Sequence, residues 1–222
     1  MLKSIGSLLG IFLFVALLSQ YTDFDLFFSD LFFNPNQNQF ILQGANKSLG
    51  IILHDYPKYL SILFAISIWI ALVTSVLFNK NFYQNWFTTR DLLFISIASI
   101  LIPFAIWWSR ELSAIHCPRE LIIYGGESLY LRILDSIPMN WSNGQCSPSA
   151  HASSFIWILS ILIVKKMKTQ AWFFTYLLIL TLSSVQVLRG AHFVTHIIYS
   201  IIIGQFILTI LKTIFYNKNN KI

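Results

Sequence analysis

Three short stretches of the sequence together supply histidines and arginines, the side chains that enzymes use to transfer phosphoryl groups. They cover residues 110–120, 147–154 and 189–196. Arginine carries a fixed charge and forked donors that match phosphate oxygens, and an imidazole can act as a nucleophile or a general acid. These residue types fit a phosphoryl transfer without a metal, in which positioning and charge stabilisation supply most of the rate.

The second stretch is predicted to open a membrane helix and to hold an anion there. Pro148 is tolerated in a first helical turn, where backbone N–H groups have no partner within the helix. The N–H groups of Ser149 and Ala150 would then point at an anion, helped by the positive end of the helix dipole. His151 would lie beside this anion and donate a proton to a leaving oxygen.

The third stretch has the spacing of one helical face. Arg189, His192 and His196 stand at positions i, i+3 and i+7, so a helix that opened at Arg189 would bring all three together. Arg189 would bind phosphate oxygens and His192 would lie beside the same phosphate. His196, one turn further along, would hold the ring of His192.

Two other kinds of site are disfavoured. Carboxylates occur near the three stretches, but the arginines interleaved with the histidines would repel a divalent cation, so we expect no metal and no organic cofactor. A serine hydrolase built on Ser149 or Ser153 would need a nucleophile-elbow sequence, G-x-S-x-G, which the chain does not contain.

The composition places this chemistry in a membrane. Of the 222 residues, 56% are hydrophobic and only 11% are charged, and the mean hydropathy is +0.66. A soluble domain carries about a quarter charged residues. A water-soluble enzyme, a disordered chain and a nucleic-acid-binding protein are therefore excluded despite the net charge of +6. We expect membrane lipids as partners and a single membrane domain over residues 1–222.

The elements that must position the site are all helices. Six apolar runs approach or reach the roughly 20 residues that a membrane span needs. They predict an all-α polytopic membrane protein with spans at about residues 5–21, 59–78, 92–108, 149–164, 169–188 and 193–211. Residues 22–57 and 109–147 would form two outer-face loops. The run FDLFFSDLFF, followed by Asn-Pro-Asn, predicts an interfacial helix and a turn in the first of them.

Charge assigns the two faces. Six spans place both termini on one side, and nine of the 15 basic residues fall there, mostly in short loops, which indicates the cytoplasm. All histidines fall on the opposite, periplasmic side: His54, His116, His151, His192 and His196. A transporter would instead bury its ionisable groups within the spans. The sequence therefore predicts a site at the outer membrane face.

The three stretches resemble the motifs of the membrane-bound type 2 phosphatidic acid phosphatase superfamily, which is related to the vanadium haloperoxidases. The first motif is lysine, six residues, then arginine-proline; here Arg110 is followed after six residues by Cys117-Pro118. The second, proline-serine-glycine-histidine, reads Pro148-Ser149-Ala150-His151. The third is arginine, five residues, histidine, three residues, aspartate, and its frame falls on Gln186, His192 and His196.

This resemblance implies a six-helix bundle and a role for each residue. His192 would be the nucleophile that forms a phosphohistidine, His151 would protonate the leaving oxygen, and His196 would orient His192. Arg110 would bind phosphate. Arg189 and Arg119 would replace the charges that are missing at the two positions where the motif arginines are absent.

The implied activity is that of a bacterial inner-membrane lipid phosphatase of a divergent branch. Its substrate would be undecaprenyl diphosphate, phosphatidylglycerophosphate, phosphatidic acid or a lipid A phosphate. A lipid phosphotransferase would use the same residues. A non-catalytic relative is the other alternative, because four positions depart from the motifs: Cys117, Ala150, Gln186 and His196.

The cysteines and two remaining histidines complete the expectations. Cys117 and Cys146 share the second outer-face loop, where they either form a disulfide that clamps two parts of the site or remain free thiols. His54 and His116 are expected to take no part in the chemistry.

Overall fold

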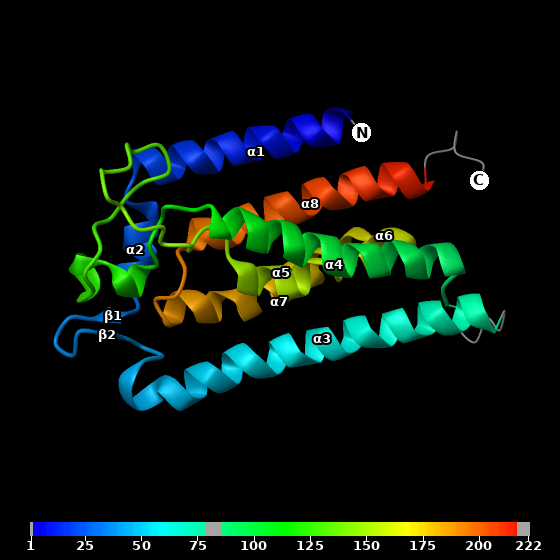
Figure 1. The fold of residues 1–222 in the computed structure, drawn as a ribbon, viewed down its shortest axis with the longest axis horizontal. Coiled ribbons are helices and arrows are strands. Elements are labelled where there is room, and N and C mark those ends of the chain that lie inside the picture. Colours follow the sequence, from blue (N-terminus) through cyan, green and yellow to red (C-terminus); the bar gives the residue numbers. More distant parts are fainter. Residues whose placement is uncertain (1, 79–85, 217–222) are drawn as a thin grey trace.

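The computed structural model describes residues 2–78 and 86–216, and most of these residues are helical (Figure 1). The α-helices are α1 (Leu2–Tyr21), α2 (Phe24–Asp30), α3 (Lys47–Leu77), α4 (Thr89–Glu111), α5 (Ala150–Ile156), α6 (Leu159–Val164), α7 (Thr169–Leu188) and α8 (Val194–Tyr216). Three short 3₁₀ turns are η1 (Gly44–Asn46), η2 (Pro118–Glu120) and η3 (Ile122–Tyr124). The strands β1 (Phe33–Asn34) and β2 (Gln39–Phe40) form an antiparallel hairpin, in which Phe33 pairs with Phe40.

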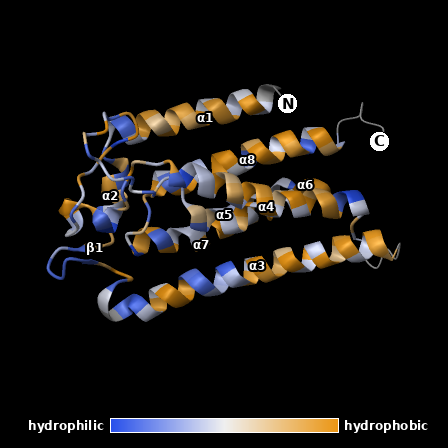
Figure 2. Cartoon of the chain, viewed as in Figure 1, coloured by the Kyte–Doolittle hydropathy of each residue, from blue (hydrophilic) through white to orange (hydrophobic). Residues whose placement is uncertain are grey.

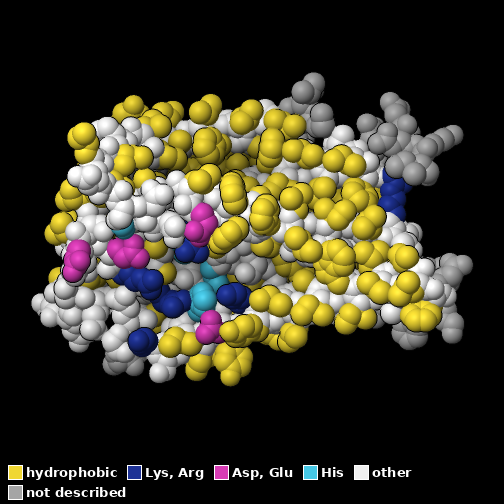
Figure 3. Space-filling view, viewed as in Figure 1, with side chains coloured by type: hydrophobic (Ala, Val, Ile, Leu, Met, Phe, Trp, Pro, Cys, Tyr) yellow, Lys and Arg dark blue, Asp and Glu magenta, His cyan; other side chains and the backbone are white. Residues whose placement is uncertain are grey.

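Five of the helices are long and apolar enough to cross a membrane: α1, α3, α4, α7 and α8. Their outer surfaces expose large apolar side chains, such as Leu13 and Leu63 at about 60%. Water-soluble proteins do not expose apolar surface on this scale. Hydrophobic residues cover the helices, and polar residues concentrate at one end (Figures 2 and 3). The predicted helical membrane class is therefore supported, with five candidate spans.

The expected fourth span is a shorter, interrupted helix. The apolar segment runs over residues 150–164, but Trp157 and Ile158 separate α5 from α6. Both helices pack inside the bundle: Ile156 and Leu159 are fully buried. Gly204 of α8 faces this segment so closely that a Cβ atom there would lie 2.3 Å from the side chain of Ile156.

The largest difference from the expected spans is in α3. The sequence predicted a span from residue 59, because an uninterrupted apolar run of the required length begins there. In the structure α3 begins at Lys47 and continues through Pro57. Its first turns pack closely, since a Cβ atom at Gly50 would lie 2.8 Å from the carbonyl oxygen of Leu42. The first loop therefore ends at residue 46, and it contains the predicted interfacial helix, α2, and a turn.

Other boundaries differ less. α4 extends the predicted span at both ends and begins with a capping box between Thr88 and Asp91. α7 has the predicted bounds, and α8 continues to Tyr216. Three lysines assigned to the cytoplasmic side, Lys80, Lys218 and Lys221, lie outside the described residues.

The helices run in alternating directions, so each end of the bundle collects a different set of helix starts and helix ends. α1 begins and α8 ends at the same end of the bundle (Figure 1). At the opposite end α1, α4 and α7 finish, and α3, α5 and α8 start. The loops at this opposite end, which we call the site end, bring the three histidine- and arginine-containing stretches together.

Candidate functional site

The third stretch is a turn between two helices. α7 ends in a Schellman motif, in which the amide of Ala191 donates to the Gln186 carbonyl and that of Gly190 to the Val187 carbonyl. Gly190 has a φ of +61°, which favours glycine. The prediction that one helix carries Arg189, His192 and His196 is therefore wrong. Arg189 closes α7, His192 lies in the turn, and only His196 is helical.

His192 is held by a main-chain carbonyl. Its Nδ1 lies 2.8 Å from the carbonyl oxygen of Cys146, and an oxygen of this kind only accepts, so Nδ1 carries the proton. The lone pair of the ring is then on Nε2, the atom a nucleophile needs. Burial lowers the pKa of His192 well below its ordinary value, and the nearby His196, Arg110 and Arg119 lower it further. The buried ring is consequently neutral at pH 7.

His196 contacts His192 through ring packing and not through a hydrogen bond among the described residues. Its ring packs edge to face with His192, with 5.9 Å between the ring centroids. No hydrogen bond joins the two rings among the described residues, because the Cys146 carbonyl takes the Nδ1 proton of His192. His196 Nδ1 is buried without a partner in the described part of the chain.

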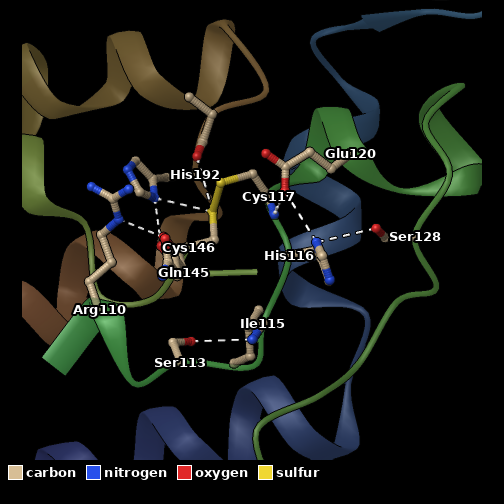
Figure 4. Close-up of a disulfide and its surroundings, with 11 residues drawn as sticks. Arg110, Ser113, Ile115, His116, Cys117, Glu120, Ser128, Gln145, Cys146 and His192 are labelled. Atoms are coloured by element: carbon tan, nitrogen blue, oxygen red, sulfur yellow. Dashed lines mark hydrogen bonds and ion pairs between the residues drawn. A yellow bond between two sulfur atoms is a disulfide. The ribbon is translucent and has the colours of Figure 1, made fainter. Parts of the chain in front are cut away.

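The disulfide between Cys117 and Cys146 is present, which decides between the two states that the sequence left open. It joins the segment after α4 to the segment before α5, directly beside His192 (Figure 4). The two sulfurs and a ring nitrogen of His192 lie within 4.8 Å of one another. The sulfurs are bonded to each other, so they are not available as thiolate ligands for a metal.

Arg110 and Gln145 strengthen the same junction. Arg110 lies in the last turn of α4, and its Nε donates to the Gln145 carbonyl at 2.5 Å, one residue before the carbonyl that holds His192. Figure 4 shows the Arg110 guanidinium and the His192 ring on the same side of this segment. The first and third stretches are thus brought together through the residues that precede α5.

The second stretch differs in detail from the prediction. Pro148 lies before α5 instead of within its first turn, because the helix starts at Ala150. The amide of Ser149 donates to the His196 carbonyl at 3.0 Å, so it is not directed at an anion. The Ser149 hydroxyl is buried and has no partner among the described residues. The hydrogen bond from the Ser149 amide to the His196 carbonyl connects the start of α5 to the first turn of α8.

His151 faces a histidine that the sequence did not associate with the site. Its ring stacks on that of His54 from α3, with 4.4 Å between centroids and 22° between planes. Both ring nitrogens of His151 are buried and lack hydrogen-bond partners within the described chain. His151 also interacts electrostatically with His192, Arg189 and Lys58. It therefore belongs to the same cluster as the predicted nucleophile.

Two arginines form the cationic wall of the site. Arg119 lies in η2, where its backbone amide donates to the Gly190 carbonyl. Burial lowers the pKa of the Arg189 guanidinium, and the nearby charge of Arg119 lowers it further. Arg189 also donates to the Gln186 side chain at 3.4 Å. Both arginines and Lys47 border a cavity of about 370 Å³ beside the hairpin and α3. Figure 3 shows Lys and Arg side chains gathered around histidine at this end.

The structure adds residues that the sequence reasoning missed. His54, Asp55 and Lys58 lie in the part of α3 that precedes the predicted span, and His54 and Lys58 interact with His151. Asp25 is a buried carboxylate of α2 that accepts from the amide and the hydroxyl of Thr195, at 3.0 and 2.5 Å. It caps the start of α8, where Phe193 has no side-chain acceptor.

One histidine, His116, lies apart from the cluster. His116 interacts with Glu120, Ser128 and the Ser142 carbonyl. Figure 4 shows its ring on the far side of the disulfide from His192.

Comparison with known proteins yields no relative: no family model, no curated protein and no solved structure matches this chain. The function must therefore be argued from the site itself.

Proposed function

We propose that the protein is a membrane-bound lipid phosphatase that forms a phosphohistidine on His192. The observation that carries the proposal is the hydrogen bond from His192 Nδ1 to the Cys146 carbonyl. It leaves a free lone pair on Nε2 of a buried ring that lies beside Arg110 and Arg119. A fixed nucleophile next to anion-binding charge is what phosphoryl transfer requires.

The reaction has two steps. Nε2 of His192 attacks phosphorus, the bond from phosphorus to the lipid oxygen breaks, and His151 gives a proton to that oxygen. Water then attacks phosphorus and gives a proton to a base of the site, the P–N bond breaks, and phosphate leaves. Arg110, Arg119 and Arg189 hold the phosphate oxygens through both steps.

Three of the four departures from the phosphatase motifs are compensated in this arrangement. The Cys146 carbonyl takes the place of the aspartate that the third motif has at position 196, since it fixes the tautomer of His192. Arg189 supplies the charge missing at Gln186, which it contacts through its guanidinium. Arg119 stands two residues after Cys117 and supplies the charge missing there.

A lipid is the substrate that fits the surroundings. The site lies at the end of helices that are apolar enough to span a membrane, and the cavity of about 370 Å³ beside Arg119 and Arg189 accepts a headgroup. With α5 and α6 counted as one span, six spans place both termini together. The basic residues near the termini assign that side to the cytoplasm of a bacterium, and the site then faces the periplasm.

The test is a phosphate-release panel on detergent-solubilised protein. The substrates are undecaprenyl diphosphate, phosphatidylglycerophosphate, phosphatidic acid and lipid A, each with and without an acceptor lipid. We expect release from at least one substrate, its loss in His192→Ala and its retention in the control His116→Ala. Phosphate that appears only on an acceptor lipid would identify a phosphotransferase. Full turnover in His192→Ala would refute the nucleophile, and no release from any lipid would refute the phosphatase.

A further inference from the structure

His54 and Asp55 of α3 form a histidine–carboxylate pair at the edge of the site. His54 Nδ1 lies 2.6 Å from an Asp55 carboxylate oxygen. A carboxylate accepts hydrogen bonds, so Nδ1 carries the proton and the lone pair of the ring is on Nε2. This is the arrangement in which a carboxylate holds an imidazole in one tautomer and stabilises the imidazolium that forms when Nε2 takes a proton.

The pair lies between the buried cluster and the solvent. The side chains of His54 and Asp55 are 24% and 34% exposed, whereas His151 is only 6% exposed as a residue. The rings of His54 and His151 are stacked face to face, so neither nitrogen of one ring points at the other. The two imidazoles therefore cannot pass a proton directly from one to the other. Each ring must exchange its proton with a different group.

Charge distinguishes the two stacked rings. Lys58 of α3 and Arg189 at the end of α7 both interact with His54 and with His151, and they oppose a positive charge on either ring. Asp55 supplies the negative charge on the His54 side. Once His151 has given up its proton, His54 is the ring that is best placed to accept the next one.

We propose that His54, oriented by Asp55, is the general base that activates water in the second step; this proposal rests on the phosphatase proposed above. His151 protonates the departing lipid oxygen as the first step ends. Water then attacks the phosphorus of the phosphohistidine, its proton passes to Nε2 of His54, and the P–N bond breaks. His54 afterwards releases this proton to solvent, while His151 takes one up, which restores the starting state.

A division of the two steps between two histidines has a kinetic signature. Loss of His54 slows only dephosphorylation, so the first turnover still releases the lipid alcohol and the phosphohistidine then accumulates. A general base contributes about 10²–10⁴-fold to a rate. A merely structural role would slow both steps together.

The experiment compares His54→Gln, Asp55→Asn and the control His116→Gln in detergent micelles. The control removes a histidine that also contacts a carboxylate, that of Glu120, but lies outside the cluster. Rapid quench into alkali, where phosphohistidine is stable, follows the lipid alcohol, free phosphate and phosphoenzyme. Hydroxylamine is added in a parallel series, because a strong nucleophile cleaves phosphohistidine without a general base.

For His54→Gln we expect a preserved burst of lipid alcohol, steady-state release slowed at least 100-fold, accumulated phosphoenzyme and rescue by hydroxylamine. Asp55→Asn should show the same pattern in weaker form, with steady-state release slowed about tenfold. This variant provides the test if His54→Gln does not fold. The control should behave like wild type. Equal loss of burst and steady state in both variants, or an unchanged steady state, would overturn the role of His54 and leave the phosphatase standing. A wild-type protein without phosphoenzyme or phosphate release would overturn both.

Discussion

Replacement of Asp25 tests how the start of α8 is held beside the site. Asp25 is 2% exposed and accepts three hydrogen bonds: from the Thr195 amide at 3.0 Å, from its hydroxyl at 2.5 Å and from the Ser19 hydroxyl at 3.2 Å. A hydrogen bond to a charged group contributes about 1.5–3 kcal/mol. Burial of the carboxyl offsets part of this gain, because it raises the pKa of Asp25 in spite of these bonds.

We therefore expect Asp25→Ala to lower the free energy of unfolding by about 2–4 kcal/mol. For a chain of this size that corresponds to a Tm lower by about 5–15 °C. Thermal unfolding in detergent, followed by circular dichroism, measures the change. The control is Asp23→Ala, which removes an exposed ion pair with Arg132 and should cost less than about 1 kcal/mol. Equal effects of the two substitutions would refute the capping role.

The pH dependence of folding stability provides a second test of Asp25. Since the pKa of Asp25 is raised on folding, the stability that its protonation adds is complete below the unfolded value of 3.8 and is lost as pH rises through the folded value. Asp25→Asn cannot ionise, so its stability should improve relative to wild type as the pH rises above 3.8. The opposite slope would show that the ionised carboxylate is the form that the fold prefers.

Three further predictions concern the turn and its clamp. Because Cys117 and Cys146 are 29 positions apart, replacement of both by serine should cost about 3.6 kcal/mol from the closed loop, measured by thermal unfolding; no change in Tm would contradict this. Gly190→Ala should cost about 1–3 kcal/mol and reduce phosphate release, since its φ is +61° and a Cβ atom would lie 2.3 Å from the Phe40 ring; a wild-type Tm would refute the strain. The acid limb of kcat/KM should lie below pH 6.5, because burial lowers the pKa of His192 and keeps the ring neutral and nucleophilic, and a limb above pH 6.5 would argue against this nucleophile.

The sequence predicted those features that depend on local composition. Apolar runs identified the helices of the bundle, and the bounds of α7 were predicted to the residue. The number of predicted spans placed the stretches that contain the histidines and arginines at one end of the bundle, and the structure gathers them there. The start of α3 was predicted poorly because the uninterrupted apolar run begins only at residue 59, whereas the contact of Gly50 with Leu42 that accompanies its earlier start is tertiary.

The composition of the chain and the order of its residues thus determined that it is helical, with helices apolar enough to cross a membrane, and that imidazoles and guanidinium groups meet at one end. The spacing of Arg189, His192 and His196 suggested a continuous helix, yet Gly190 ends α7 between them. Only the tertiary structure decided which atoms hold the reactive groups. The carbonyl that fixes His192 is 46 residues away, and the carboxylate that caps α8 is 170 residues from Thr195. Contacts over such separations depend on how helices pack, which no local pattern of residues encodes.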